Sequence, residues 1–366
     1  MKNKIHITGI PTNPAIRELS PDPFARSAYF LTNLLHANGW KVYYYGYEEC
    51  DVECSKKIDI VNLKWRKEIT NVDIDAFGPA VASIKYDRLF NSKLIPHLNK
   101  NLEDGDIIIC MWSRQIEDIV NNLEKNVKVI DGHIGHHYPS KLTKYHVYTS
   151  DALRSWVYGK HNEIYKNRWN HVTIPPMSTS INDFRYLENK EEYFLYMSRL
   201  IDVKGIDIFL KLAEILPNEK FKLAGSGSID KYKLPKNVEF LGILDIENRK
   251  EYMSKAKAVI TPVKYFEPFG LTAIESALSG TPIITTDWGG YTNNVVEGVT
   301  GYQCSNLCDF LNAMHDLNKI SSINCRVWGE KYVNEHLISK WETYLTDVIR
   351  DDFYDIKSQK ELKSNF

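Results

Sequence analysis

The sequence lacks the features that tie a protein to a membrane or to a polyanion. No apolar run approaches the length of a membrane span, and the N-terminal stretch MKNKIHITGI has the pattern of a strand rather than of a signal peptide. The 366 residues carry 46 Lys and Arg against 47 Asp and Glu, so no overall field attracts a nucleic acid. We therefore expect a cytoplasmic protein without a transmembrane segment, while peripheral membrane contact stays open.

Cysteine and internal repetition are also scarce. The six Cys show neither the C-x2-C spacing nor the His pairing that is typical of zinc sites, so we expect reduced thiols and no metal. There is no repeat of fixed short period and no low-complexity segment. Because 366 residues exceed what one hydrophobic core usually takes, the length predicts two domains.

The first half opens with a strand, a loop, a helix and a second strand. The pattern predicts strands at residues 4–10 and 41–46 and a helix at 24–38, which Gly39 ends. This order is typical of a doubly wound domain, whose ligands bind beyond the carboxyl ends of its strands. Residues 47–78 show no clear pattern, and 79–102 are predicted to form a helix that is interrupted at Pro96.

Two further segments of this half are candidates for binding. The loop DGHIGHHYPS follows a predicted strand at 127–130 and holds His133, His136 and His137; a site for a sugar and a solvated loop are both compatible with it, whereas a metal would need accompanying carboxylates or Cys. The stretch 141–170 mixes basic and aromatic residues. It is either a surface that reads a polyanion or an aromatic core face beside a solvated basic face.

In the second half, two cations follow a predicted strand at 193–197. Arg199 and Lys204 stand in SRLIDVKG, directly before a predicted helix at 205–216. A helix start disfavours cations, which indicates that they serve a ligand. Arg offers a planar fork and Lys a mobile point charge, so the pair suits an anionic ligand; the alternative is two surface cations at a helix start.

Residues 261–301 form the unit on which the second half is built. The pattern predicts a strand at 258–263, a loop at 265–270, a helix at 271–278 and a strand at 283–286. Glu267 in the loop and Glu275 in the helix can both face the mouth of the sheet. The helix start there attracts an anion such as phosphate, and the carboxylates suit hydroxyls of a sugar and a ribose nearby.

The run E-P-F-G-L-x-x-x-E, followed by G-T-P and T-D-x-G-G, resembles retaining glycosyltransferase family 4, the E-x7-E group. The alternative is an ordinary βαβ unit with two solvated Glu. The resemblance covers residues 190–303 well and the first half in outline. It implies the GT-B fold, in which two Rossmann-like doubly wound α/β domains face each other across a cleft. The domains are then 1–176 and 191–335, with a linker at 177–190 and a helix at 336–366 that returns to the first domain.

The resemblance also implies roles for individual residues. Arg199 and Lys204 would clamp the donor diphosphate, Glu267 would hold the donor sugar and Glu275 the ribose. His133 resembles the His that contacts the sugar in related enzymes. The remaining donor contacts would come from backbone near the strand ends: Phe269, Gly270, Leu271, Gly225, Gly242 and Leu244. Two departures from the family are the missing Gly-Gly in the loop before residue 24 and Asn293–Asn294, where relatives commonly have a Glu.

The implied activity is retaining transfer of a hexose-type sugar from a UDP- or GDP-sugar to a hydroxyl of a glycan or a lipid-linked sugar. The nucleotide-sugar is a co-substrate, and no cofactor is expected. The alternatives are the same chemistry on a hydroxymethylated base in DNA, a sugar-nucleotide epimerase, a hydrolase or phosphorylase, and a sugar-nucleotide sensor. The donor, the acceptor and the oligomeric state stay open.

Overall fold

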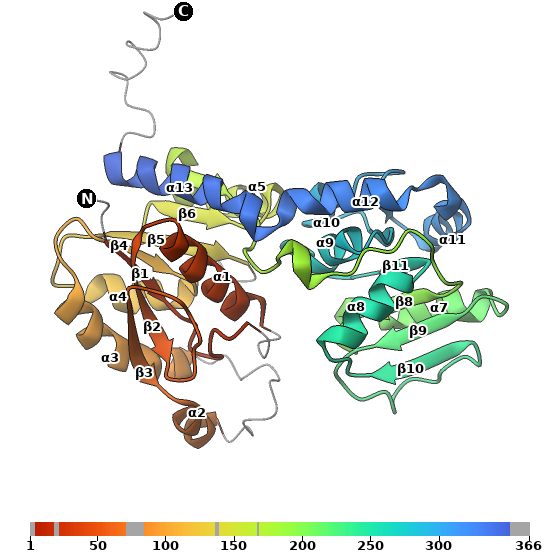
Figure 1. Ribbon diagram of the computed structural model, residues 1–366, viewed down its shortest axis with the longest axis horizontal. Coiled ribbons are helices and arrows are strands. Elements are labelled where there is room, and N and C mark those ends of the chain that lie inside the picture. Colours follow the sequence, from red (N-terminus) through yellow and green to blue (C-terminus); the bar gives the residue numbers. More distant parts are fainter. Residues whose placement is uncertain (1–3, 18–21, 71–83, 136–138, 167, 352–366) are drawn as a thin grey trace, which may run out of the picture. The chain divides into compact units, whose positions relative to one another are not determined.

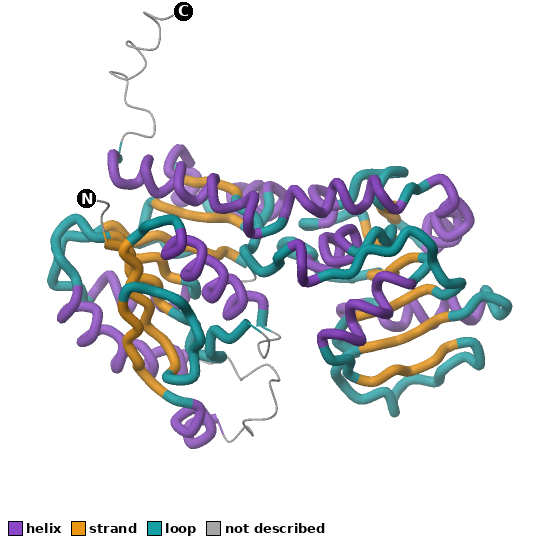
Figure 2. Tube along the Cα trace, in the orientation of Figure 1, coloured by secondary structure: helices purple, strands orange, loops and turns teal. Residues whose placement is uncertain are grey.

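The computed structural model describes residues 4–17, 22–70, 84–135, 139–166 and 168–351 (Figures 1 and 2). The chain divides into two compact units, each with its own parallel sheet. Unit 1 comprises Met1–Thr149, Arg154–Ser178 and Leu337–Phe366, and unit 2 comprises Ser150–Leu153 and Thr179–His336.

Within the described residues, unit 1 has a seven-stranded parallel sheet in the order β3-β2-β1-β4-β5-β6-β7. Its strands are β1 (Lys4–Thr8), β2 (Lys41–Tyr47), β3 (Lys56–Val61), β4 (Ile107–Cys110), β5 (Lys128–Ile134), β6 (Tyr145–Tyr148) and β7 (His171–Thr173). The helices that belong wholly or mostly to unit 1 are α1 (Pro23–Ala37), α2 (Leu63–Thr70), α3 (Ile84–Asn101), α4 (Ile116–Asn121), α5 (Asp151–Lys160), α6 (Asn162–Tyr165) and α13 (Asn334–Arg350).

Unit 2, all of which is described, has a six-stranded parallel sheet in the order β10-β9-β8-β11-β12-β13. Its strands are β8 (Phe194–Met197), β9 (Phe221–Ala224), β10 (Val238–Gly242), β11 (Ala258–Thr261), β12 (Ile283–Thr286) and β13 (Gly301–Cys304). Its helices are α7 (Ile206–Ile215), α8 (Ile246–Lys255), α9 (Leu271–Leu278), α10 (Tyr291–Asn294), α11 (Leu307–His315) and α12 (Ser322–Gly329).

Both sheets follow the strand order of a doubly wound Rossmann-like domain, as the sequence predicts. In unit 2 the first strand, β8, lies in the middle, and the chain then adds β9 and β10 on one side and β11 to β13 on the other (Figure 1). The order therefore reverses between β8 and β11. In open sheets of this kind, ligands bind beyond the carboxyl ends of the two strands at the reversal.

The strands of unit 2 bury side chains on both faces. Successive side chains of a strand point to opposite faces. Phe194 and Tyr196 of β8 consequently pack with α7 and α11 in one core, while Leu195 packs with Met253 of α8 and Ala273 of α9 in another. The helices α7 and α11 thus cover one face of the sheet, and α8 and α9 cover the opposite face.

Three local expectations for the first half are wrong. Residues 47–78 are not irregular throughout, because β3 and α2 lie within them. The helix α3 continues through Pro96. A proline has no N–H to donate to the carbonyl four residues earlier, which here belongs to Ser92. Pro96 and Ser92 are both exposed, so water can bond that carbonyl. The strand β5 extends to Ile134, so Asp131–Ile134 is strand rather than loop.

Candidate functional site

Two loops of unit 2 meet at the point where its strand order reverses. One follows β8 and ends in the short 3-10 helix Asp202–Lys204, and the other follows β11 and leads to α9. Backbone contacts hold them together: the N–H of Lys264 donates to the carbonyl of Val203 at 2.9 Å. Gly205 has a φ of +74°, and a Cβ there would lie 1.8 Å from the carbonyl oxygen of Pro262, so this close approach requires glycine.

Lys204, Tyr265 and Glu267 form a hydrogen-bonded cluster on these two loops. The Nζ of Lys204 lies 2.9 Å from Oε2 of Glu267 and 2.5 Å from the hydroxyl of Tyr265, and that hydroxyl also donates to Oε2 of Glu267. The side chains of Lys204 and Glu267 are only 15% and 13% exposed. A cation and an anion are therefore held at the carboxyl edge of the sheet, with a phenol oxygen between them.

The surroundings keep Tyr265 in its neutral form. Burial raises the pKa of its hydroxyl well above the ordinary value, the Glu267 carboxylate raises this pKa further, and the charge of Arg199 opposes them. The Nζ of Lys204 also lies 4.7 Å from the centre of the Tyr265 ring. Tyr265 can therefore donate its proton in a hydrogen bond to Glu267 while its oxygen accepts from Lys204.

The double glycine after β12 packs against the loop that carries Glu267. The N–H of Gly290 donates to the backbone carbonyl of Glu267 at 2.6 Å. A Cβ on Gly289 would lie 2.5 Å from that carbonyl oxygen, and a Cβ on Gly290 would lie 2.4 Å from Cα of Phe269. The two glycines thus allow the loop after β12 to pack directly against the loop that carries Glu267.

Glu275 lies in α9 and is buried, with its carboxylate 3.3 Å from the guanidinium of Arg249. Tyr291 is buried, and burial is the main cause that raises the pKa of its hydroxyl. The charges of Glu267 and Glu275 each raise this pKa further. The two carboxylates are therefore both near enough to this phenol for their charges to affect it.

The start of α9 offers backbone N–H groups beside Glu267. Gly270 precedes the helix with a φ of +85°, and no side chain caps the first turn. Phe269 is buried and Leu271 is partly buried, so their predicted contribution to a ligand would come from the backbone.

The other predicted donor residues lie along the same edge of the sheet. Arg199 is exposed in the loop after β8. A Cβ on Gly225 would lie 1.7 Å from the carbonyl oxygen of Ser198, and the N–H of Gly225 donates to the carbonyl of Gly242 at 2.9 Å, so the loops after β8, β9 and β10 are in contact. Leu244 is partly buried at the turn after Gly242, beside Ile243, which is 77% exposed.

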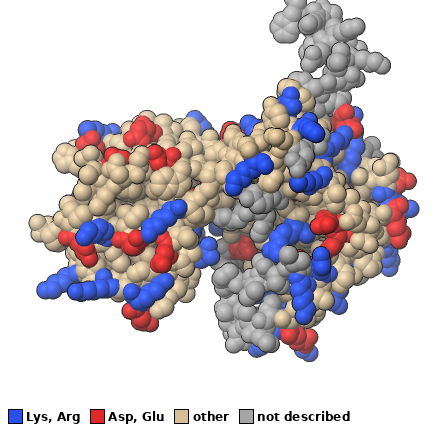
Figure 3. Space-filling view, turned by 180° about the vertical axis from the view of Figure 1, so that it is seen from behind, with Lys and Arg blue, Asp and Glu red and all other residues tan. Residues whose placement is uncertain are grey.

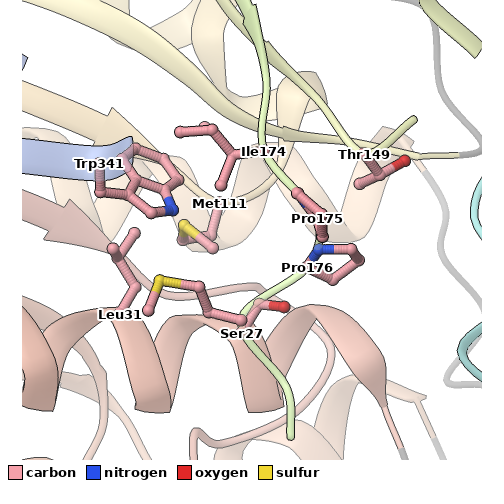
Figure 4. A pocket seen from close by; sticks show the side chains of 10 residues that line it. Ser27, Leu31, Met111, Thr149, Ile174, Pro175, Pro176 and Trp341 are labelled. Atoms are coloured by element: carbon pink, nitrogen blue, oxygen red, sulfur yellow. The ribbon is translucent and has the colours of Figure 1, made fainter. Parts of the chain in front are cut away.

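The His-containing segment of unit 1 lies largely outside the described residues. His133 lies within β5, and its side chain, together with His136 and His137, lies outside what the structure describes. A cavity in unit 1 between α1, Pro175–Pro176 and Trp341 has a volume of about 10 Å³, which fits one water and no sugar (Figure 4). In the described ranges, no group of three or more His, Cys, Asp and Glu side chains could hold a metal ion.

Sequence reasoning missed two residues of the site. Tyr265 stands two residues before Glu267, and its position in a loop between two predicted elements was the available signal. Arg249 lies in α8, whose sequence IENRKEYMSK is charged and weakly amphipathic, so nothing in its pattern pointed to Glu275. Both side chains contact residues that the sequence did single out.

Part of the chain, nearly all of it in unit 2, is similar to known proteins. Residues 179–309 match the family model described as glycosyl transferases group 1. A curated relative, the glycogen synthase of Mycobacterium tuberculosis, is 32% identical over 123 residues, which cover 30% of this chain and 30% of the relative. The chain therefore matches under a third of that relative's length.

Solved structures resemble nearly the whole chain. AviGT4, a glycosyltransferase involved in avilamycin A biosynthesis, superposes with a TM-score of 0.66 and 16% identity over 95% of this chain and 98% of that one. Anabaena HepE in complex with UDP-glucose superposes with a TM-score of 0.61 and 12% identity over 94% and 100%. The fold is therefore GT-B, with two Rossmann-like domains, as the resemblance implies. Across the residues that the structure describes, no helix is both long and apolar enough to cross a bilayer.

Proposed function

We propose that the protein transfers a hexose-type sugar from a nucleotide-sugar to a hydroxyl of an acceptor such as a glycan or a lipid-linked sugar, with retention at the anomeric carbon. The observation that carries the proposal is the Lys204–Tyr265–Glu267 cluster at the reversal of the strand order. This cluster lies inside the segment that matches glycosyl transferases group 1.

The residues of the cluster meet the main electrostatic demand of such a transfer. When the bond between the anomeric carbon and the diphosphate breaks, both electrons leave on the diphosphate, whose charge must be stabilised. Lys204, Arg199 and the uncapped N–H groups at the start of α9 would be the donors for this. Glu267 would accept from hydroxyls of the donor sugar, and Glu275 from the ribose.

Donor binding would change the partner of Lys204. In the structure Lys204 is paired with Glu267. A donor diphosphate would compete for its ammonium, and the sugar hydroxyls would take its place beside the carboxylate. The Tyr265 hydroxyl, which contacts both side chains, would keep them aligned during this exchange.

A UDP-sugar is the donor that we expect first. HepE, which shares the fold, has been solved with UDP-glucose. The exposed Ile243 and the partly buried Leu244 give the turn after β10 an apolar surface against which a flat base can rest. A GDP-sugar is the second choice: the apolar side chains Ile243 and Leu244 do not distinguish one base from another, and the HepE complex favours UDP.

The ion pairs weigh against a hydrolase with the same two carboxylates. A glycosidase needs one carboxylic acid that gives a proton to the leaving oxygen. Glu267 is paired with Lys204, and Glu275 with Arg249. Each carboxylate thus already has a cation as its partner, which is not the arrangement of a general acid that contacts a leaving oxygen.

DNA as the acceptor has less support than a glycan. In the stretch 141–170, Lys160 lies 4.3 Å from the ring centre of Trp156, and Arg168 lies 4.6 Å from that of Tyr165 and 4.8 Å from that of Trp169. These basic groups already contact aromatic rings of the protein itself. On the face shown in Figure 3, basic and acidic side chains are interspersed rather than gathered into a basic stripe.

The test is a donor screen followed by product analysis. The protein is incubated with UDP- and GDP-hexoses, with and without a panel of glycan and lipid-linked acceptors, and release of nucleoside diphosphate is measured. We expect release that depends on the acceptor, and a product whose new bond keeps the anomeric configuration of the donor by NMR. Release of free sugar from glycans without any nucleotide would contradict the proposal, as would conversion of the donor sugar without an acceptor.

A further inference from the structure

Asn294 stands in the area where the resembled family commonly has a Glu, and the proposed function gives it no role. It is the last residue of α10 and is only 2% exposed. Its side-chain amide donates to the backbone carbonyl of Phe269 at 2.5 Å. Phe269 belongs to the turn before α9, so this buried side chain contacts the candidate donor site through the backbone of that turn.

Asn294 is itself held in place from two sides. Its N–H donates to the carbonyl of Gly290 at 3.2 Å, and its carbonyl accepts from Nε1 of Trp328 in α12 at 2.9 Å. A backbone carbonyl can only accept, so the NH2 side of the Asn294 amide must be the side that faces Phe269. A fixed backbone and a buried side chain therefore give this donor a single direction.

Other residues of the same segment pack against this turn. A Cβ on Gly270 would lie 2.5 Å from the ring of Tyr291, and a Cβ on Gly290 would lie 2.4 Å from Cα of Phe269. These contacts determine where the turn lies. The bond from Asn294 determines how its peptide plane is rotated, because no other described residue donates to the Phe269 carbonyl.

The direction of the Phe269 carbonyl also sets the direction of the next N–H. In a trans peptide the C=O and the N–H point opposite ways, and none of the described peptide bonds is cis. With the carbonyl turned toward Asn294, the N–H of Gly270 points away from it. Among the described residues nothing accepts from this N–H. Gly270 has a φ of +85° and precedes α9, and successive N–H groups at such a turn can surround an anion.

We propose that Asn294 is a positioning residue of the donor site: it holds the Phe269 carbonyl so that the N–H of Gly270 is directed at an oxygen of the donor diphosphate. This inference rests on the proposed function for the identity of the ligand. A carboxylate could not replace the amide of Asn294, because it would face a carbonyl oxygen and both groups only accept.

The test uses Asn294→Asp, which exchanges the amide for a carboxyl group of nearly the same size. The ionised carboxylate cannot donate to the Phe269 carbonyl, whereas the protonated acid has an O–H that can. Burial favours the protonated acid, so the bond should be absent at pH 8 and restored at pH 5.

The matched control is Asn237→Asp. The Asn237 amide also donates to backbone carbonyls of unit 2, but away from the turn; its acceptors, each at 3.0 Å, are Ala213, Leu216 and Glu219. This variant loses structural hydrogen bonds of the same kind and leaves the Phe269 carbonyl untouched.

The readouts are the assigned amide resonance of Gly270 in the 15N-glycine-labelled full chain and the Kd of UDP by titration, at pH 5 and pH 8. UDP and inorganic pyrophosphate should each shift this resonance in the wild type. In Asn294→Asp at pH 8 the shift should be lost and the Kd of UDP should rise about tenfold or more, the range of one hydrogen bond to a charged group. At pH 5 both should return to near the wild-type values, and Asn237→Asp should match the wild type throughout. Glu267, Glu275 and UDP titrate in all three proteins, so each comparison is made at one pH.

A wild-type Gly270 resonance that responds to neither UDP nor pyrophosphate would overturn the inference. Equal UDP affinity of Asn294→Asp and the wild type at pH 8 would also overturn it, and so would a loss that is the same at both pH values, which structural damage alone explains. If the carboxylate prevents folding, Asn294→Ala removes the donor without adding a charge and should lose the Gly270 shift; a normal shift would overturn the inference. A wild type whose Gly270 resonance responds to UDP but which transfers no sugar would overturn the proposed function alone.

Discussion

Replacing Tyr265 by Phe is a selective probe of the cluster, because it removes one oxygen atom and keeps the ring beside Lys204. The lost hydroxyl donates to Glu267 and accepts from Lys204, so two charged side chains lose a shared partner. A hydrogen bond to a charged group contributes about 1.5–3 kcal/mol. If that much orientation is lost in the transition state, kcat/KM falls about ten- to a hundredfold.

Stability should change much less than activity. Lys204 and Glu267 keep their own contact in Tyr265→Phe, and water can reach these partly exposed groups. We expect a loss of about 1 kcal/mol, which lowers the Tm of a unit of this size by roughly 2–4 °C. The fall in kcat/KM should appear mainly in kcat, because both groups that bind the donor are still present.

The matched control is Tyr302→Phe. The Tyr302 hydroxyl donates to the carbonyl of Asp316 at 3.1 Å in the same unit, away from the cluster. This variant should transfer sugar within about twofold of the wild type while showing a Tm loss of similar size. The reasoning would be refuted if Tyr265→Phe kept wild-type kcat/KM, or if Tyr302→Phe reduced it equally.

Three further predictions concern contacts of the site, and a fourth concerns the buried Asp131 of unit 1. Lys204→Ala should lower kcat by at least about a hundredfold in the donor assay and leave the circular dichroism spectrum unchanged. Lys257→Ala, which removes an ion-paired lysine at the opposite end of β11, should keep the wild-type kcat. Equal activity of the two variants would exclude the clamp. Glu267→Gln should abolish transfer yet bind UDP more tightly in a titration, because Lys204 loses its competing anion; weaker UDP binding would contradict this. Arg249→Ala should raise the KM for the donor more than it lowers kcat, because Glu275 loses the cation that orients it, and a loss confined to kcat would count against a ribose contact. Burial raises the pKa of Asp131 to about 7, so this group favours folding below pH 4 and the contribution is lost as the pH rises through 7. The Tm of Asp131→Asn relative to the wild type should therefore rise between pH 5 and pH 8, by the equivalent of about 3 kcal/mol at most. A flat difference would show that the group titrates normally.

The central elements of unit 2 were predictable because strong local signals bound them. The helix and strand predicted at 271–278 and 283–286 have these bounds in the structure. Gly270 and the run Gly280–Pro282 interrupt regular structure on either side of the helix, and the apolar run that follows fits a strand buried on both faces.

The elements that the sequence did not reveal have weak local patterns. The strand β3, with the sequence KKIDIV, lies at the edge of its sheet and exposes both lysines, so its apolar signal is short. The helix α8 is largely exposed and carries few apolar residues. In both cases contacts with distant parts of the chain determine the structure, and local periodicity carries no information about those contacts.

The site was predictable as a set of residues but not as a set of contacts. Lys204 could be singled out because a cation is disfavoured at a helix start, and Glu267 because it stands in the E-P-F-G-L-x-x-x-E run after a strand. That they bond to each other depends on β8 and β11 being neighbours, which is a property of the strand order. The third member, Tyr265, has no unusual local feature and is recognised only by its distance from both.

The ion pair between Lys204 and Glu267 would affect how tightly a donor binds. Lys204 lies beside the Glu267 carboxylate at low exposure and is already largely desolvated. Its transfer to a diphosphate therefore costs less desolvation free energy than the transfer of a lysine from water. The same pairing also lowers its affinity for free phosphate, because Glu267 must first release it. A donor avoids this penalty when its sugar hydroxyls replace the lysine at Glu267, which neither free phosphate nor a nucleotide without a sugar can do. The arrangement would thus favour the intact nucleotide-sugar over its nucleotide product, and the preference would come from the exchange of partners at Glu267.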